Sequence, residues 1–154
     1  NKLKEKLTIR LAPRYLISRW AVHQRWNDFD PNIKLENGIA KITKLFSQNR
    51  LTIFSYDSTG MLETLSRNIP TLGFWSDDYN HLLDEAKPFY KTLADVGIIH
   101  FSAESAAKKI DEIWDNIDEW WSRSDVQEAR KIFCAQYAKN SNNPAFELKK
   151  ILLS

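Results

Sequence analysis

Apolar and polar residues alternate over residues 7–11, which is the period of a strand with one better-buried face. Pro13 ends this pattern, because proline has no backbone N–H to donate to a sheet. Residues 15–31 show no clean period, so we predict a long loop there with room for a short helix. Ile33 and Leu35 predict a brief second strand.

The following stretch changes to a helical period. Asn37-Gly38 is a turn signal. After this turn, apolar residues recur at the spacing of an amphipathic helix, namely Ile39, Ile42, Leu45 and Phe46. We predict that this helix ends near Asn49.

The clearest pattern lies in residues 51–75. It predicts a strand at 51–55, a turn at 56–58, a helix at 59–68 with one apolar face, and a strand at 70–75. The proline that leads the second strand occupies the position where a missing donor does least harm. A strand, a crossover helix and a strand of these lengths form a right-handed βαβ unit and hence a parallel sheet.

Residues 76–101 predict one more helix and one more strand. Residues 76–81 are polar and are expected to form a loop. A helix is predicted over residues 82–95, with a kink or interruption at Pro88. Gly97 ends this helix, and a short strand follows at 98–101.

Three helices are expected to complete the chain. Ser102 is a favourable N-cap for a long first helix, whose buried stripe is formed by Ala106, Ile110, Ile113, Trp114, Ile117 and Trp121. The second helix runs from about 125 to 139 and the third from 145 to 153. This order predicts an α/β fold, a Rossmann-like three-layer α/β/α arrangement with a mostly parallel sheet and a C-terminal cluster of helices. We interpret residues 1–154 as one such domain.

Composition narrows the function rather than the fold. A net charge of +2 is too small to indicate nucleic acid or an anionic membrane as the partner. The single cysteine, Cys134, excludes an internal disulfide and suits a reducing compartment. No apolar run reaches the roughly 20 residues of a transmembrane helix. The first residues lack a signal-peptide pattern and an initiating Met, so we expect an excerpt of a longer, cytoplasmic protein.

Ligands of doubly wound sheets bind at the carboxyl ends of strands, which directs attention to residues 10–14, 55–60 and 75–81. Asp57-Ser58-Thr59-Gly60 closes a strand and opens a helix, where backbone N–H groups are unpaired and positively polarised. Two hydroxyls and a glycine at this point would form a phosphate cradle without a glycine-rich loop, which suits a chain with only 4 Gly. The alternative is plain N-capping by Ser58 or Asp57.

Glu63 lies four residues after Thr59, on the same side of the predicted helix. With Ser58 as N-cap, a capping box would need an acid at position 61, which is Met61. A carboxylate just behind a phosphate site is well placed to accept hydrogen bonds from ribose hydroxyls. The alternative is a solvated glutamate on the helix surface.

A family resemblance rests on these residues. Ser-Tyr-Asp-Ser-Thr-Gly-Met-Leu-Glu-Thr-Leu at 55–65, followed by Asn-Ile-Pro-Thr at 68–71, resembles the donor-binding segment of GT-B glycosyltransferases. The turn also resembles that of CDP-glycerol polymerases of teichoic-acid synthesis. From about residue 7 to 137 the chain is similar to the C-terminal halves of transferases from bacterial surface-carbohydrate clusters. The shared motifs are Pro70-Thr71 with Phe74-Trp75, Asp84-Glu85-Ala86-Lys87-Pro88, Ile113-Trp114-Asp115 and Gln127-Glu128-Ala129-Arg130.

The resemblance implies a role for each residue of the turn. Ser58, Thr59 and Gly60 would bind the donor diphosphate and Glu63 the ribose, while Arg10 would meet the leaving phosphate. Weaker candidates for the donor site are Asp57, Arg14 and His81. The upstream GT-B domain normally supplies the acceptor site and the general base, so the catalytic residues stay unknown.

The sequence indicates neither a metal nor a cofactor. The three histidines and Cys134 lack the spacing of a metal site, and GT-B enzymes generally do not need an Asp-x-Asp motif, so Asp77-Asp78 is interpreted as loop polarity. Basic residues interleave with tryptophans over residues 14–26, but Asp28, Asp30 and the small net charge argue against nucleic acid.

The expected partners are a nucleotide-sugar donor and an N-terminal domain of the same protein. A lipid-linked acceptor would bring the protein to the inner face of the membrane. The function predicted first is glycosyl transfer in bacterial surface-polysaccharide biosynthesis. Two alternatives stay open, which are a phosphotransferase that uses a CDP-alcohol and a non-catalytic module that binds a sugar nucleotide or acts as a scaffold.

Overall fold

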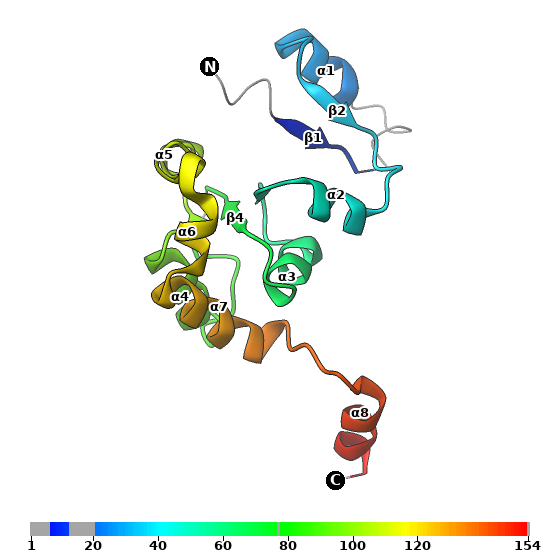
Figure 1. Cartoon of the computed structure of the whole chain (residues 1–154), viewed down its shortest axis with the longest axis vertical. Helices are drawn as coiled ribbons and strands as arrows, with labels where there is room; N and C mark the ends of the chain where they lie inside the picture. The colour runs from blue at the N-terminus through cyan, green and yellow to red at the C-terminus, as the bar shows by residue number, and fades with distance from the viewer. Residues whose placement is uncertain (1–6, 13–20, 77, 154) are drawn as a thin grey trace. The chain divides into compact units, whose positions relative to one another are not determined.

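The computed structural model in Figure 1 describes residues 7–12, 21–76 and 78–153. Contacts divide the chain into two compact units, an N-terminal unit Asn1–Gln48 and a C-terminal unit Asn49–Ser154. Both units contain parallel strands that alternate with helices. The predicted α/β class with parallel strands is therefore confirmed.

The N-terminal unit contains a two-stranded parallel sheet. Strand β1 (Thr8–Arg10) pairs with β2 (Lys34–Glu36), in a register that places Ile9 opposite Leu35. Both predicted strands are thus confirmed. Helix α1 (Val22–Phe29) occupies part of the predicted long loop, and Pro13 and Arg14 lie outside the described residues.

Helix α2 (Ile42–Gln48) begins three residues later than its apolar period predicts. The carboxylate of Glu36 accepts hydrogen bonds from the backbone N–H groups of Gly38, Ile39 and Ala40, at 3.1, 2.9 and 3.0 Å. Gly38 has a φ of 77°, as the predicted turn requires. These bonds hold residues 38–40 in a turn, and Ile39 is left exposed instead of starting the helix.

The C-terminal unit is built on a three-stranded parallel sheet in the order β3-β4-β5. The strands are β3 (Thr52–Phe54), β4 (Thr71–Phe74) and β5 (Ile99–His100). Helix α3 (Thr59–Ser66) connects the first two and buries Met61, Thr64 and Leu65. The predicted βαβ unit is therefore confirmed.

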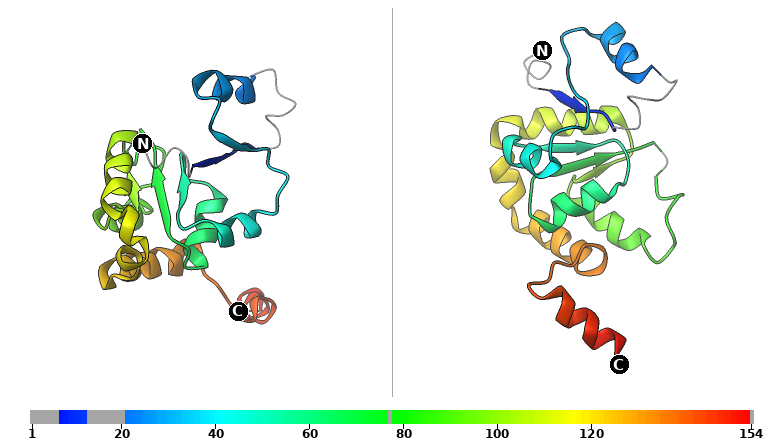
Figure 2. Two further views of the ribbon diagram at one scale, coloured as in Figure 1. Left: turned by 45° about the horizontal axis from the view of Figure 1, so that its top comes forward. Right: turned by 90° about the vertical axis from the view of Figure 1, so that its right-hand side faces the viewer.

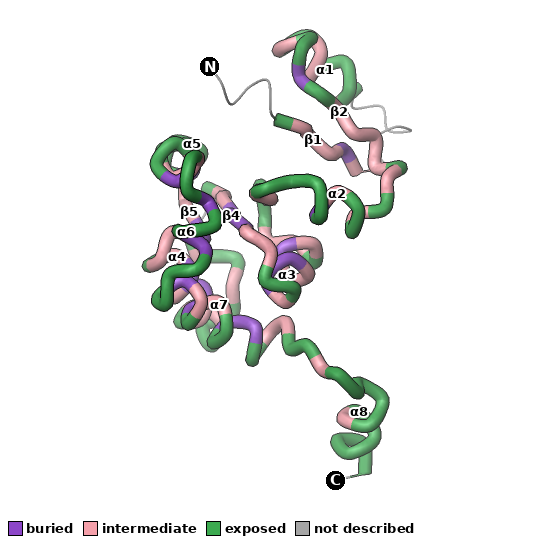
Figure 3. Tube along the Cα trace, in the orientation of Figure 1, coloured by how far each residue is buried: buried purple, intermediate pink, exposed green. Residues whose placement is uncertain are grey.

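Helices cover both faces of this sheet. Figure 2 shows α3 and α4 (Lys87–Asp95) on one face and α5 (Ala103–Ile113) on the other. Buried positions gather on α3, β4, α6 (Ile117–Ser122) and α7 (Ser124–Tyr137), as Figure 3 shows. The core cluster of this unit includes Met61, Leu93, Ile98 and Phe133. The predicted three-layer arrangement is thus present in the C-terminal unit.

Pro88 begins α4 rather than interrupting it. Residues 79–86 form turns, in which the Ala86 N–H donates to the Leu83 carbonyl at 2.9 Å, and α4 starts at Lys87. In the first turn of a helix the missing N–H of proline costs nothing, and its fixed φ suits the helix. The predicted helix over residues 82–95 was therefore wrong over residues 82–86, and the predicted kink at Pro88 was wrong as well.

The long helix predicted after Ser102 is broken into α5, the 3-10 helix η3 (Trp114–Asn116) and α6. A 3-10 turn has about 3.0 residues per turn instead of about 3.6, so the break rotates α6 about its axis. Trp120, which the single-helix stripe omits, is buried beside Trp121. The C-terminal helices α7 and α8 (Pro144–Leu152) lie where the sequence predicts them.

Candidate functional site

The polar turn at residues 55–58 follows β3 and leads directly into α3. Ser58 is the N-cap residue, with extended backbone angles, but its side chain makes no capping hydrogen bond. Its carbonyl accepts from the N–H groups of Met61 and Leu62, at 2.9 and 3.4 Å. Asp57 makes no capping bond either, since its carboxylate is directed to His81. Plain N-capping is therefore not what these two side chains do.

Several polar groups at the start of α3 have no partner among the described residues. They are the hydroxyls of Ser58 and Thr59 and the backbone N–H groups of Thr59 and Gly60. The first N–H groups of a helix point outward along its axis and carry partial positive charge. This end of α3 thus presents four unused hydrogen-bonding groups within three residues.

Gly60 allows α3 to start close to the sheet. A Cβ atom at this position would lie 2.9 Å from Cε1 of Phe54, the last residue of β3. Any side chain would push against this ring, so glycine has a packing role at this position.

Glu63 lies one turn further along α3 and is half-buried. Its carboxylate has no hydrogen-bond or ion-pair partner among the residues that the structure describes. It does not cap the helix. A polar group that is half-buried and unused in the fold is available to a ligand.

His81 and Asp57 are 24 residues apart in the sequence and meet in the structure. Nε2 of His81 lies 3.2 Å from Oδ2 of Asp57. The His81 ring also packs edge-on against Trp75, with ring centroids 5.7 Å apart. Burial and then the charge of Asp57 raise the pKa of Tyr90, another ring in contact with Trp75, to about 12. Tyr90 therefore stays neutral. Asp57 and His81, two of the weaker candidates for the donor site, thus contact each other.

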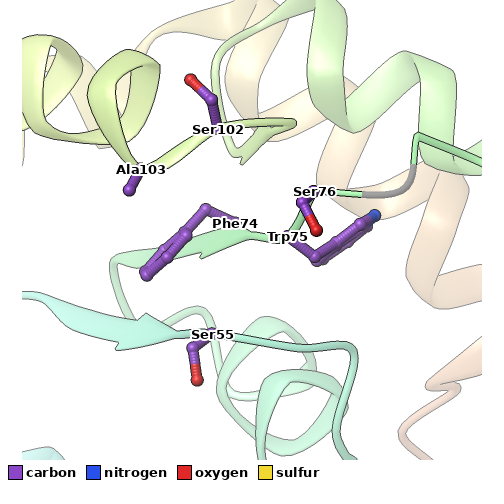
Figure 4. Close-up of a pocket in the computed structure, with 6 residues that line it drawn as sticks. All are labelled: Ser55, Phe74, Trp75, Ser76, Ser102 and Ala103. Carbon is purple, nitrogen blue, oxygen red and sulfur yellow. The ribbon is translucent and has the colours of Figure 1, made fainter.

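A pocket of about 270 Å³ opens at the carboxyl ends of the three strands. Figure 4 shows the Phe74 ring between Ser55 below and Ser102 and Ala103 above. The lining residues are Ser55, Phe74, Trp75, Ser76, Ser102 and Ala103. Ser58, Thr59 and Gly60 do not line this pocket.

Ser102 lines this pocket but is not among the site residues predicted from the sequence. It was predicted as the N-cap of α5, and its Oγ indeed accepts from the Ser105 N–H at 3.0 Å. The strand at 98–101 ends just before Ser102, so the rule for carboxyl ends of strands applies to it as well.

Arg10 belongs to the N-terminal unit, whereas residues 55–60 belong to the C-terminal unit. Its guanidinium forms an ion pair with Glu36 and donates to the carbonyls of Gly38 and Ala40, at 3.2 and 3.0 Å. Burial acts to raise the pKa of Glu36, but hydrogen bonds from Ala40 and Gly38 and the charge of Arg10 outweigh it and lower the pKa. Arg10 is thus already employed in holding the 36–40 turn, and Arg14 lies outside the described residues.

The described ranges contain no group of three or more His, Cys, Asp and Glu side chains that could hold a metal ion. Cys134 is a free, buried thiol. Within the same ranges, no helix combines the length and the apolar character needed to cross a membrane.

A protein-family model described as LIC12162 family transferase matches residues 1–152. No curated protein matches the chain. No solved structure matches it either.

Proposed function

The chain belongs to the LIC12162 family of transferases, and from that premise we propose that it is the donor-binding part of a glycosyltransferase. The donor is a nucleotide sugar, and the pathway is bacterial surface-polysaccharide biosynthesis. One observation carries the proposal, which is the set of unused hydroxyl and N–H groups at the start of α3.

These groups suit a diphosphate. The start of a helix favours an anion through its free N–H groups and its dipole. Ser58 and Thr59 add two hydroxyl donors, and Gly60 leaves the approach open. When the sugar is transferred, the nucleoside diphosphate departs with growing negative charge, and donors already fixed in place stabilise that charge.

Glu63 is proposed to hold the ribose of the donor. It lies one turn behind the phosphate groups, and its carboxylate has no other partner among the described residues. A carboxylate accepts hydrogen bonds from two neighbouring hydroxyls in a geometry that a ribose offers. The domain that binds the acceptor and supplies the general base is proposed to be a separate N-terminal domain of the same protein.

Calorimetry with UDP, GDP, CDP, CMP and CDP-glycerol tests this proposal. We expect one nucleoside diphosphate to bind the chain, and a Ser58→Ala/Thr59→Ala variant to bind it at least about tenfold more weakly, because two charge-assisted hydrogen bonds are lost. Ser66→Ala is the matched control, since Ser66 lies at the other end of α3. Equal affinity of the wild type and the double variant would overturn the site, and preference for CDP-glycerol would favour the phosphotransferase alternative.

A further inference from the structure

The contact between Asp57 and His81 carries an inference beyond the turn itself. Both side chains are about one-third exposed, at 32% and 34%, so a ligand in solution can reach the pair. The position of the ring is fixed from two sides. Asp57 contacts its Nε2, and the Trp75 ring packs against it at right angles, with the ring centroids 5.7 Å apart. Trp75 is itself held, because its Nε1 donates to the Asp78 carbonyl at 2.8 Å.

The second ring nitrogen is unused. Nδ1 of His81 has no partner among the described residues, whereas Nε2 is directed to Asp57. A carboxylate that accepts from one imidazole nitrogen fixes both the orientation of the ring and the role of the other nitrogen. The arrangement therefore presents Nδ1 as a hydrogen-bonding group of fixed direction.

A lone carboxylate next to Ser58 would be unfavourable for the proposed function, since Asp57 would repel a diphosphate at the start of α3. The ion pair with His81 offsets this repulsion when the imidazole is protonated. In that state Nδ1 carries a proton, and a charge-assisted hydrogen bond to a phosphate oxygen is among the stronger hydrogen bonds in proteins.

We propose that Asp57 is a positioning residue that holds His81, and that Nδ1 of His81 contacts a phosphate oxygen of the nucleoside diphosphate bound at the start of α3. This inference rests on the proposed function. It assigns the two residues different roles, because Asp57 acts only through His81 and the imidazole touches the ligand.

Two substitutions at His81 distinguish the roles of its two ring nitrogens. The amide of His81→Gln reaches the place of Nε2 and can still bind Asp57, but it leaves nothing at the place of Nδ1. The amide of His81→Asn stands at the place of Nδ1. The probe is whichever of UDP, GDP and CDP binds the wild type, measured by calorimetry together with the matching nucleoside. His23→Gln, a change of an exposed histidine in the N-terminal unit, is the control.

We expect His81→Gln to weaken binding of the diphosphate about tenfold and His81→Asn to weaken it less, with the affinity for the nucleoside unchanged in both. In an Asp57→Asn background, His81→Gln should reduce the affinity for the diphosphate by a smaller factor than in the wild type, because the two residues act as one unit.

Three results would overturn the inference. The first is wild-type affinity in His81→Gln, which leaves the proposed function standing if the Ser58→Ala/Thr59→Ala variant still loses binding. The second is an equal loss of diphosphate and nucleoside binding, which would assign the pair to the folding of the loop. The third is a wild type that binds none of the three diphosphates, in which case the proposed function fails with it.

Discussion

His100 ends β5 with both ring nitrogens engaged inside the protein. Nδ1 lies 2.8 Å from the Ser105 hydroxyl and Nε2 lies 3.1 Å from the Gly97 carbonyl. Burial lowers the pKa of His100 below its ordinary value, and the charge of Lys109 adds to this effect, although the Gly97 carbonyl opposes it. A neutral ring protonated at Nε2 satisfies both contacts, since Nε2–H donates to the carbonyl and Nδ1 accepts from the hydroxyl.

This lowered pKa predicts a loss of stability in mild acid. The unfolded chain takes up the proton first, near pH 6.5, so the stabilising contribution is complete above that pH and is lost as the pH falls towards the folded pKa. Urea unfolding should show a lower free energy of unfolding at pH 5.5 than at pH 7.5, and a smaller difference in His100→Gln. His23→Gln should behave like the wild type, and an unchanged pH dependence in His100→Gln would contradict the assignment.

Replacement of Gly60 by alanine is expected to destabilise the protein, although helix propensity alone favours alanine. Alanine at a helix position is ordinarily favoured over glycine by up to about 1 kcal/mol. Here its Cβ would meet Cε1 of Phe54 at 2.9 Å, and overpacking of this kind costs about 1–3 kcal/mol. Gly60→Ala should therefore lower the free energy of unfolding by about 1 kcal/mol in urea titrations.

A second substitution identifies the cause. Phe54→Leu shortens the side chain that the new methyl group meets. The double variant should therefore lose less free energy of unfolding than the two single variants lose together. A Gly60→Ala protein that is more stable than the wild type would show that the Phe54 ring moves aside freely.

Among the elements, α3 is held at its C-terminal end by side chains from α6 and α7. Nη1 of Arg130 donates to the Leu65 carbonyl at 2.9 Å. Nε1 of Trp121 donates to the carbonyl and side-chain oxygens of Asn68, at 3.2 and 3.0 Å. The Leu65 carbonyl also accepts from the Asn68 backbone N–H at 3.1 Å, so Arg130 adds a second hydrogen bond to the end of α3 that ties it to α7.

Removing one of these donors should loosen the packing of α3 on α7. Arg130→Met keeps much of the aliphatic length and loses the hydrogen bond, for an expected loss of about 1–2 kcal/mol in the free energy of unfolding. Lys131→Met is the matched control, because Lys131 is exposed on the next position of α7. Equal melting temperatures for the two variants would mean that water replaces the guanidinium at no cost.

The elements also show what periodicity can and cannot predict. The strands and helices of the βαβ unit follow from local apolar patterns, and the structure confirms them. The start of α2 could not be predicted in this way, because it is set by Glu36, whose carboxylate is fixed by Arg10 from 26 residues away. Likewise, the spacing of apolar residues does not reveal that Pro88 begins a helix instead of bending one.

At the scale of the whole molecule, the candidate site was predictable only in part. The sequence placed the polar turn at a strand end, since parallel strands present their carboxyl ends on one edge. The contact of His81 with Asp57 and the lining of the pocket by Ser102 depend on how three strand ends lie side by side. That arrangement follows from the order β3-β4-β5, which no local pattern specifies.

The reactivity of the Cys134 thiol can show whether the C-terminal unit unfolds cooperatively. It is the single cysteine of the chain and lies on α7 among the core residues. Burial raises the pKa of this thiol, although Arg130 opposes the effect, so the native protein offers little of the reactive thiolate. Reaction with a thiol reagent such as Ellman's reagent should therefore be slow in native buffer and fast in urea.

A substitution on another helix makes the rate of thiol labelling a test of cooperative unfolding. When opening is fast relative to labelling, the rate follows the population of the open form. Gly60→Ala does not alter the surroundings of the thiol directly, yet it should speed labelling about fivefold for each kcal/mol that it removes from the free energy of unfolding. If labelling kept the wild-type rate while urea unfolding showed the loss, α7 would open independently of the sheet and α3. A proportional increase would establish that the helix carrying the proposed diphosphate site and the helix carrying Cys134 belong to one cooperative core.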